Sequence, residues 1–288
     1  MDTKNLILAI AASLAILLGW QTFIEQPRQA EKQAELERQE QAVGRDPNTI
    51  GVPSLPSPDG NQAAGAAEPR ARDEVIADTP RITINTPALS GTINLVGGRF
   101  DDLTLRDYRD TIEPGSKLIK LLSPRGSEDP YFAEFGWLTG NGTVSGGGQT
   151  RWTANQGELT PDSPVVLTTR TDDGLVLTRT VAVDDHFMFT VTDRIQNAGT
   201  TPINVSQFGR ITRVNEPDTL GFFILHEGPI GILGDTLHEI DYDDLEDEPE
   251  APQTFESEGG WLGFTDIYWL TALIPDQDTQ VDARFLFD

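Results

Sequence analysis

The sequence predicts a mainly β protein, an antiparallel β-sandwich of many strands that follows one N-terminal transmembrane helix and a disordered linker. Three observations lead to this fold class. Residues 5–24 carry no charge and are mostly apolar, residues 43–80 are rich in Pro, Ala and Gly, and apolar side chains repeatedly alternate with polar ones in the later part of the chain. The expected boundaries are 1–24 for the span, 25–80 for the linker and 81–288 for the β domain.

The charge balance excludes several classes of function. The 288 residues include 46 acidic and 21 basic side chains, which gives a formal net charge of −25, and the chain has no Cys. This acidic surplus argues against binding of nucleic acid, which needs Lys and Arg to neutralise phosphates. A chain without Cys has no disulfide, thiolate metal site or Cys nucleophile. The length accommodates one large β domain or two ordinary ones.

The first expected element is a membrane anchor at residues 1–24. At about 1.5 Å per residue, its uncharged stretch crosses the roughly 30 Å of hydrocarbon in a lipid bilayer. Trp20 and Phe23 lie at the far end, where aromatic side chains favour the membrane–water interface. The alternative is a cleaved signal peptide, but no cleavage site with small residues follows the apolar stretch. The expected span therefore includes Leu6, Leu18, Trp20 and Ile24.

Basic residues leave the orientation of this span open. Only Lys4 precedes it, whereas Arg28, Lys32 and Arg38 follow it, which mildly favours a cytoplasmic C-terminal side. Long domains cross the membrane largely regardless of charge, so this argument is weak.

The linker at residues 25–80 has two parts. Residues 25–42 are rich in Glu, Gln, Ala, Lys and Arg and predict a solvated helical stalk with almost no apolar face. Residues 43–80 are too poor in large apolar groups to offset the entropy of ordering and predict a flexible tether. A proline-rich ligand is the alternative, but a basic Pro-x-x-Pro core is missing.

From residue 81 onward the pattern is that of β-strands. One face of each expected strand carries its apolar members: Ile82 and Ile84; Ile93 and Leu95; Leu103 and Leu105; Leu175, Leu177, Val181 and Val183; Phe187, Phe189, Val191 and Ile195; and Val281, Ala283, Phe285 and Phe287. Asp172-Asp173-Gly174 predicts a hairpin turn, because Asp-Gly suits positive φ. Turns are also expected at Asp184-Asp185 and at Asn197-Ala198-Gly199.

The groups that could carry chemistry are interpreted as structural. His226 and His238 each precede a Glu, and β-sandwich sugar epimerases use His with a carboxylate, but neighbours along a strand point to opposite faces. His186 falls in an expected turn. Residues 241–250 contain seven acids and no basic residue, and Glu246 stands where a calcium-binding loop needs Gly, which predicts an exposed solvated loop. No catalytic residue, cofactor or metal site is expected.

Two stretches together resemble the YidC family of bacterial membrane protein insertases. The apolar opening is similar to that family's first membrane span. More specific is the stretch 259–275, which resembles the motif near the end of the family's large periplasmic domain and contains Gly259, Gly260, Trp261, Tyr268 and Pro275. We interpret this motif as structural.

Supporting similarity lies in Ile84-Asn85-Thr86, in Gly97-Gly98, and in the stretch from Asp193 to Gly199 that leads into Ser206-Gln207-Phe208-Gly209. The resemblance covers essentially the whole chain. One departure is Ile267, where the family commonly has Lys, and it affects only a local surface charge.

The resemblance implies a β-supersandwich domain related to sugar mutarotases, anchored at the inner membrane with a cytoplasmic N-terminus and a periplasmic β domain. It also implies membrane protein insertion and folding, alone or with the Sec translocon components SecYEG and SecDF, on nascent membrane proteins. The family adds a membrane core of five helices, so this sequence is expected to be an N-terminal fragment of roughly half a family member. The β domain is then expected to dock partners rather than act as an enzyme.

Two other classes of function stay open from the sequence. A periplasmic carbohydrate-binding or mutarotase-like protein would need His and carboxylate groups that converge in a cleft. A purely structural periplasmic adaptor would have no insertase core after the β domain.

Overall fold

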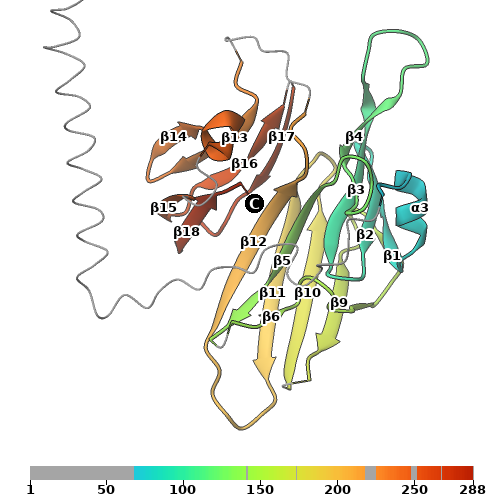
Figure 1. Ribbon diagram of the computed structural model, residues 1–288. Coiled ribbons are helices and arrows are strands. Elements are labelled where there is room, and N and C mark those ends of the chain that lie inside the picture. Colours follow the sequence, from blue (N-terminus) through green and yellow to red (C-terminus); the bar gives the residue numbers. More distant parts are fainter. Residues whose placement is uncertain are drawn as a thin grey trace, which may run out of the picture. The chain divides into compact units, whose positions relative to one another are not determined.

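The computed structural model describes residues 68–140, 142–172, 174–217, 225–247, 252–266 and 268–287 (Figure 1). The expected membrane anchor, with Leu6, Leu18, Trp20 and Ile24, lies outside the described residues, as does the linker up to residue 67. No helix among the described residues is long and apolar enough to cross a membrane.

The largest sheet has eight strands. After the short helix α3 (Arg72–Ala77), its order is β12 (Val205–Arg213), β5 (Tyr131–Thr139), β3 (Arg99–Arg109), β2 (Leu89–Asn94), β1 (Arg81–Asn85) and β8 (Glu158–Leu159), with β4 (Leu118–Leu122) paired to β3 and β6 (Val144–Ser145) paired to β5. Every pairing is antiparallel except that of β1 with β8.

A second sheet packs against the first. Its order is β11 (Phe189–Asn197), β10 (Leu175–Val183), β9 (Val165–Arg170) and β7 (Thr153–Ala154). One hydrophobic core contains residues of both sheets, including Ile82, Ile93 and Leu105 of the first and Leu167 and Leu177 of the second. These two sheets confirm the predicted mainly β, sandwich-like fold.

The C-terminal strands form two smaller sheets on the β12 side of the sandwich (Figure 1). One has the order β14 (Thr236–Glu239), β13 (Gly228–Leu233), β16 (Trp261–Asp266) and β17 (Trp269–Leu273), and the other pairs β15 (Gln253–Glu258) with β18 (Gln280–Phe285). Their own core contains Leu233, Ile240, Leu245, Ala283 and Phe285.

The period-two patterns correspond to strands where the alternation is strict. In β10 every second residue is buried, from Leu175 to Val183. The predicted hairpin joins β9 to β10, and Gly174 has the expected positive φ of 89°. At Asp184 the predicted turn is present, but Phe187 belongs to this turn and is half exposed, because the Asp184 carboxylate accepts the N–H groups of His186 and Met188 at 2.9 and 3.0 Å.

The acidic segment is more ordered than expected from the sequence. Instead of a simple loop, residues Tyr242–Glu246 form the short helix α4, with Asp243 and Asp244 in its first turn. Acidic side chains favour the positive end of the helix dipole, and Leu245 is buried in the smaller core. The acidic side chains from Asp241 to Asp247 are solvent-exposed, as expected.

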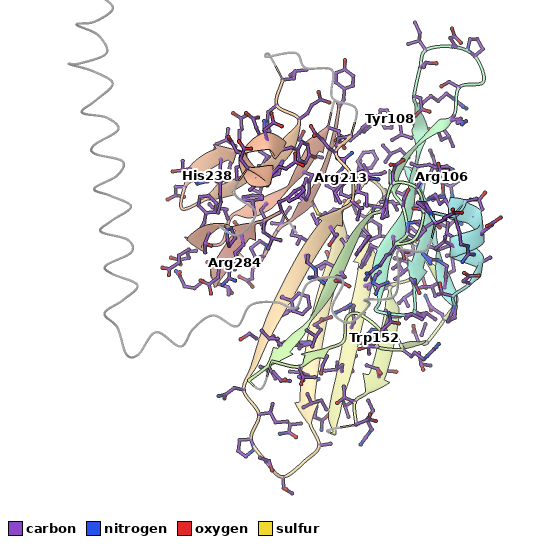
Figure 2. All side chains as sticks on the ribbon, in the orientation of Figure 1. Arg106, Tyr108, Trp152, Arg213, His238 and Arg284 are labelled. Carbon is purple, nitrogen blue, oxygen red and sulfur yellow. The ribbon has the colours of Figure 1, made fainter. Side chains whose placement is uncertain are left out.

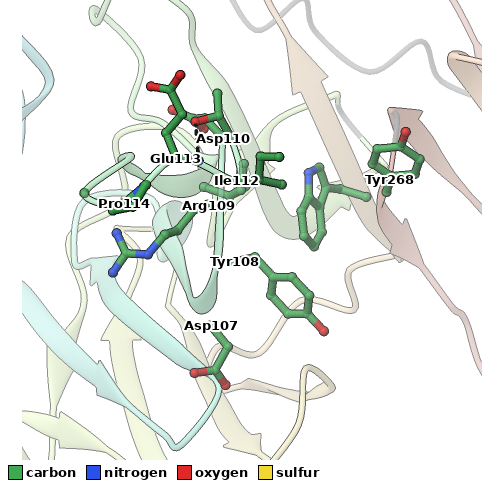
Figure 3. Close-up of a pocket in the computed structure, with 12 residues that line it drawn as sticks. Asp107, Tyr108, Arg109, Asp110, Ile112, Glu113, Pro114 and Tyr268 are labelled. Carbon is green, nitrogen blue, oxygen red and sulfur yellow. Dashed lines mark hydrogen bonds between the residues drawn. The ribbon is translucent and has the colours of Figure 1, made fainter.

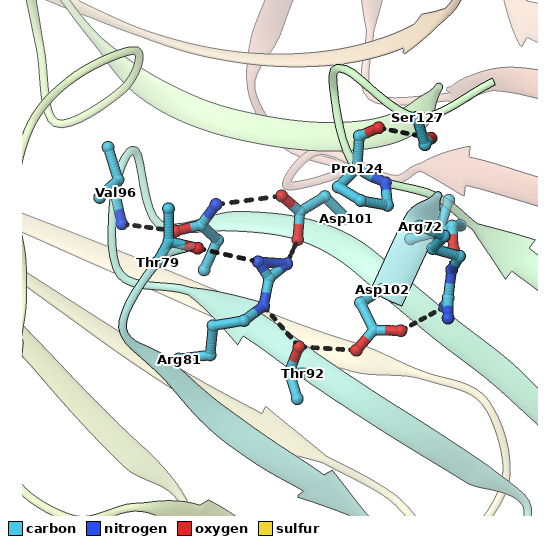
Figure 4. A network of polar contacts seen from close by, with 11 residues as sticks. Arg72, Thr79, Arg81, Thr92, Val96, Asp101, Asp102, Pro124 and Ser127 are labelled. Carbon is cyan, nitrogen blue, oxygen red and sulfur yellow. Dashed lines mark hydrogen bonds and ion pairs between the residues drawn. The ribbon is translucent and has the colours of Figure 1, made fainter. Parts of the chain in front are cut away.

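Charged groups lie inside the sandwich as matched pairs. The side chains of Arg179 and Asp193 are 0% and 1% exposed, and they form two parallel hydrogen bonds of 2.7 Å. A second network joins Arg81 to Asp101 and Arg72 to Asp102, with the Thr92 hydroxyl between them (Figure 4). Pairing offsets the large cost of moving each charge out of water.

Candidate functional site

The three histidines lie in three different local settings. His186 is exposed in its turn. The Nε2–H group of His226 donates to the Pro229 carbonyl at 2.9 Å, and its Nδ1 lies 3.7 Å from a carboxylate oxygen of Asp241. His226 therefore precedes β13 rather than lying within a strand, and its carboxylate neighbour is distant in sequence.

His238 belongs to β14 on the outer part of the C-terminal sheets (Figure 2). Its Nε2 lies 3.3 Å from the Leu233 carbonyl oxygen, and its ring centroid lies 4.3 Å from that of Phe255. The approach to Leu233 lies within the β13–β14 hairpin, and the Phe255 contact joins this hairpin to the neighbouring sheet of β15 and β18. Among the described residues no cluster of three or more His, Asp or Glu side chains is arranged to hold a metal ion.

The glycines of the family-like motif form the turn between β15 and β16. Gly259 and Gly260 have φ values of 65° and 88°. A Cβ on Gly260 would lie 2.2 Å from the Ile232 carbonyl oxygen, and one on Gly259 would lie 2.7 Å from that of Gln277. Only glycine fits both the backbone conformation and this close approach.

The remaining motif residues are distributed along the β16–β17 hairpin. Trp261 begins β16 and is partly buried, and Tyr268 lies at the tip between β16 and β17. Pro275 follows β17, and its carbonyl accepts a hydrogen bond of 2.7 Å from the Gln277 side chain. The glycines of the motif therefore lie where two backbones approach closely, whereas the side chain of Tyr268 lies on the surface.

An open groove of about 640 Å³ lies between this hairpin and the β3–β4 hairpin (Figure 3). Strand β3 is buried up to Leu105, apart from the partly buried Thr104, and is exposed from Arg106 to Arg109, so its end projects beyond the core. The groove is lined by Tyr108, Ile112 and Pro114 from the β3–β4 hairpin and by Tyr268 and Trp269 from the β16–β17 hairpin.

Hydrogen bonds define the shape of the β3–β4 loop. The N–H group of Asp110 donates to the Lys117 carbonyl at 3.0 Å, and that of Thr111 donates to the Ser116 hydroxyl at 3.0 Å. The Arg109 guanidinium donates to the Ser116 carbonyl. With its polar groups satisfied locally, the loop leaves the side chain of Ile112 entirely in solvent, at 105% relative exposure.

The β16–β17 hairpin is fixed to the large sheet by an ion pair. Arg213 on β12 donates to the Asp266 carboxylate at 2.5 Å, and its guanidinium lies 4.8 Å from the ring centroid of Tyr131 (Figure 2). Burial disfavours the charged guanidinium, but the Asp266 carboxylate, together with the side chains of Tyr242 and Tyr131, outweighs burial, so the pKa of Arg213 is raised. The guanidinium therefore stays charged, and the hairpin that carries Tyr268 has a rigid base.

From the sequence, Tyr268 was interpreted as a structural residue of the motif, and neither the groove nor the other residues that line it were predicted. Tyr108 packs edge-on against Trp269 with ring centroids 4.8 Å apart, and it lies 6.4 Å from Phe187. One feature of the sequence that could have indicated an exposed apolar site is Ile112, a large aliphatic residue next to the turn-forming sequence Glu113-Pro114-Gly115. Such a residue has no structural use in a turn.

The fold defines a class of protein, the antiparallel β-sandwich modules, here with an open groove between two hairpin tips. A sequence profile of the YidC periplasmic domain matches residues 81–287. The chain therefore belongs to the YidC periplasmic domain family.

Several relatives are named "Membrane protein insertase YidC". The chain is 41% identical over 290 residues to that of Rhizobium meliloti (strain 1021), with 99% of this chain and 48% of the relative covered. It is 42% identical over 292 residues to that of Sinorhizobium medicae (strain WSM419), with the same coverage. The relative from Methylobacterium radiotolerans is 40% identical over 303 residues, with 99% of this chain and 49% of the relative covered. The chain spans about half the length of these curated relatives.

Proposed function

We infer that this chain is the anchor and periplasmic part of a membrane protein insertase of the inner membrane, which assists insertion and folding of nascent membrane proteins. The observation that carries this proposal is the 41% identity to an insertase along 99% of the chain. The described domain exposes apolar residues at two hairpin tips, Ile112 and Tyr268. Its role is to dock partners, not to catalyse a covalent reaction.

The proposed arrangement in the membrane follows the expected domain boundaries. Residues 1–24 anchor the chain in the lipid bilayer with the N-terminus in the cytoplasm, residues 25–80 form the tether, and residues 81–288 form a β-supersandwich in the periplasm. The Sec translocon, through SecYEG and SecDF, is the proposed neighbour. The motif residues Gly259, Gly260, Trp261 and Pro275 have a structural role within this arrangement.

The orientation is tested by labelling introduced thiols. Because the chain has no Cys, a single substitution gives the only reactive thiol. Intact cells that produce the complete chain are treated with a membrane-impermeant maleimide. We expect Ser57→Cys to be labelled and Thr3→Cys to be labelled only after lysis. The reverse pattern would refute the orientation.

The insertase role is tested by cross-linking to nascent chains. A photoreactive amino acid replaces Tyr268 in the complete chain, and ribosomes stalled on a membrane protein or on a secreted soluble protein are supplied. We expect cross-links to the membrane protein and few to the soluble one. Equal cross-linking to both would refute the role. The same membranes, solubilised and captured through a tag on this chain, are expected to retain SecDF above the level of a tagged control sandwich.

The carbohydrate-binding or mutarotase-like alternative receives no specific support. It would need His226 or His238 to face a carboxylate in a cleft, whereas the carboxylate beside His226 belongs to the exposed Asp241, and the Nε2 atom of each ring lies against a main-chain carbonyl. Neither residue lines the groove between the two hairpins.

A further inference from the structure

We propose that the outer face of the β14–β13–β16–β17 sheet docks onto the surface of a bilayer of zwitterionic phospholipids. Six uncharged side chains make up most of this face: Ile230, Ile232, Leu237, Trp261, Thr265 and Leu270. The inference rests on the proposed function, because the anchor at residues 1–24 keeps the sheet near a membrane. It adds a lipid contact that the insertase role does not by itself require.

The pairing registers show which side chains share the outer face. Residues directly opposite one another on neighbouring strands point to the same side of a sheet, and successive residues along a strand alternate. Ile232 lies opposite both Leu237 of β14 and Trp261 of β16, which gives a row of large apolar side chains across three strands. Farther along β16, Thr265 lies opposite Leu270 of β17 in the same phase. The outer face therefore extends over all four strands.

The inner face of this sheet is covered, whereas the outer face is not. Leu233 is buried in the smaller core and Leu262 packs against it. On the outer face, Leu237, Leu270 and Ile232 are 53%, 51% and 38% exposed. An antiparallel sheet with one solvated side normally carries polar residues there. Large apolar residues in that position indicate a surface that makes a further contact.

The size of the outer face argues against a second copy of the chain as its occupant. With strands about 4.8 Å apart and a rise of about 3.3 Å per residue, four strands of at most six residues cover roughly 15 by 20 Å, or about 300 Å². A stable protein–protein interface buries about 800 Å² on each partner. A bilayer needs no such area, because the proposed anchor holds the domain beside it at a high effective concentration.

The charges around the outer face favour zwitterionic lipids. Residues 214–283 contain many acids and no Lys or Arg. Of the residues that the registers place on the outer face, only Glu239 is charged, and Asp235 lies in the adjoining turn. Anionic headgroups, or a second copy of the chain, would oppose these carboxylates with like charge. Zwitterionic headgroups instead carry an ammonium group that complements them.

Aromatic side chains at the two ends of β16 fit a membrane–water interface. Trp261 is the first residue of β16, and Tyr268 lies just beyond its last residue with its side chain 80% exposed. Trp and Tyr favour this interface because each combines an apolar ring with a polar group. The aliphatic residues of the sheet can then face the lipid while the aromatic residues flank them.

The test measures contact between single positions and lipid in vesicles that hold the complete chain. Because the chain has no Cys, Leu270→Cys carries the only environment-sensitive fluorophore, and Thr192→Cys, exposed on β11, is the control position. The vesicles are phosphatidylcholine with a nitroxide quencher on the acyl chain. We expect strong quenching at position 270 and little at 192. Phosphatidylglycerol should reduce the quenching at 270, and added salt should restore it by screening the repulsion.

Variants of the outer face test the apolar contribution. Ile232→Gln combined with Leu237→Gln should lower the ratio of docked to undocked domains by about tenfold, because both side chains lose apolar area that docking buries. The matched control is Met188→Gln, a 52% exposed apolar residue outside this sheet, which should leave the quenching unchanged. Urea unfolding of each variant checks that the fold is intact.

Three results would overturn the docking. One is equal quenching at positions 270 and 192. Another is stronger quenching in phosphatidylglycerol vesicles than in phosphatidylcholine alone. The third is energy transfer between labelled copies without lipid quenching, which would show that a second copy covers the outer face.

Failure of the docking and failure of the proposed function are distinguishable. A chain that does not float with the vesicles would refute the anchor and the docking together. A chain that floats and cross-links selectively to nascent membrane proteins, but shows no quenching at position 270, would refute the docking alone. Quenching without selective cross-linking would refute the insertase role alone.

Discussion

The buried pair of Arg179 and Asp193 gives the sharpest prediction about stability. Asp193→Asn keeps the shape of the side chain but removes the charge that faces the guanidinium. Arg179 would then remain fully buried, at 0% exposure, without a counter-ion. We expect this substitution to lower the free energy of unfolding of the β domain.

The magnitude follows from the cost of an unpaired buried charge. Breaking one partner of a buried pair costs about 3–5 kcal/mol, against a total stability of about 5–15 kcal/mol for a typical domain. Replacing both partners by apolar residues is often neutral. The double variant Arg179→Met with Asp193→Leu loses the guanidinium contacts with Trp152 and Phe135, at 5.0 and 5.5 Å, but keeps apolar packing on both rings. We therefore expect it to be more stable than Asp193→Asn by about 2 kcal/mol.

Urea unfolding of the complete chain, followed by tryptophan fluorescence, measures both values, and Trp152 reports directly on the site because it contacts Arg179. The control is Arg170→Met, an exposed arginine on β9, which should change stability by less than about 0.5 kcal/mol. A cost below about 1 kcal/mol for Asp193→Asn, or a double variant no more stable than the single one, would refute the reasoning.

Three further predictions concern other parts of the domain. Gly260→Ala should lower the free energy of unfolding by more than about 2 kcal/mol, because its Cβ would clash with the Ile232 carbonyl oxygen. Gly115→Ala, at φ 86° with open space around it, should lower it by only the roughly 1 kcal/mol that the left-handed conformation costs. Thermal unfolding compares the two variants, and equal losses would contradict the close approach at Gly260. Burial alone would raise the pKa of Glu134, but Arg210 and Arg99 outweigh burial and lower the pKa below its ordinary value. The stability that Glu134 contributes is therefore present above its unfolded-state pKa and is lost as the pH falls through the lower folded-state pKa. Glu134→Gln should flatten the acid side of the stability curve in urea titrations at successive pH values, and an unchanged slope would oppose this. Leu245→Ala, at 6% exposure, should cost about 2–4 kcal/mol and lose the helical order of α4 in hydrogen exchange; unchanged protection of α4 would show that the leucine does not anchor it.

Local patterns made the sandwich predictable from the sequence. Strict alternation fixes which face of a strand is buried, and the turn at Gly174 is predictable from the residues of the turn alone. Arg179 lies in the same inward phase of β10 as Leu177 and Val181. A charge in that phase indicates a buried partner, but the sequence does not show which acid, because Asp193 is identified only once β10 and β11 are in register.

The groove was not predictable because it depends on contacts between distant segments. Tyr108 and Trp269 meet at 4.8 Å although the whole second sheet and much of the C-terminal part lie between them in the chain. Helix α4 was not predicted for a similar reason: it is stabilised by the burial of Leu245 in a core that other strands form. An acidic segment with one buried leucine has no local pattern that distinguishes it from a loop.

The positions of the motif residues distinguish those that the fold requires from those that burial does not explain, a distinction that the sequence alone does not give. The glycines at 259, 260 and 263 allow backbones to approach within distances that a Cβ would forbid, so the fold itself requires them. Tyr268, on the same hairpin, is 80% exposed, and its side chain contributes little to either hydrophobic core. Burial therefore does not explain a large aromatic residue at this tip. The Arg213–Asp266 pair holds the base of this hairpin in place, so the ring of Tyr268 is presented at a fixed position beside the open groove.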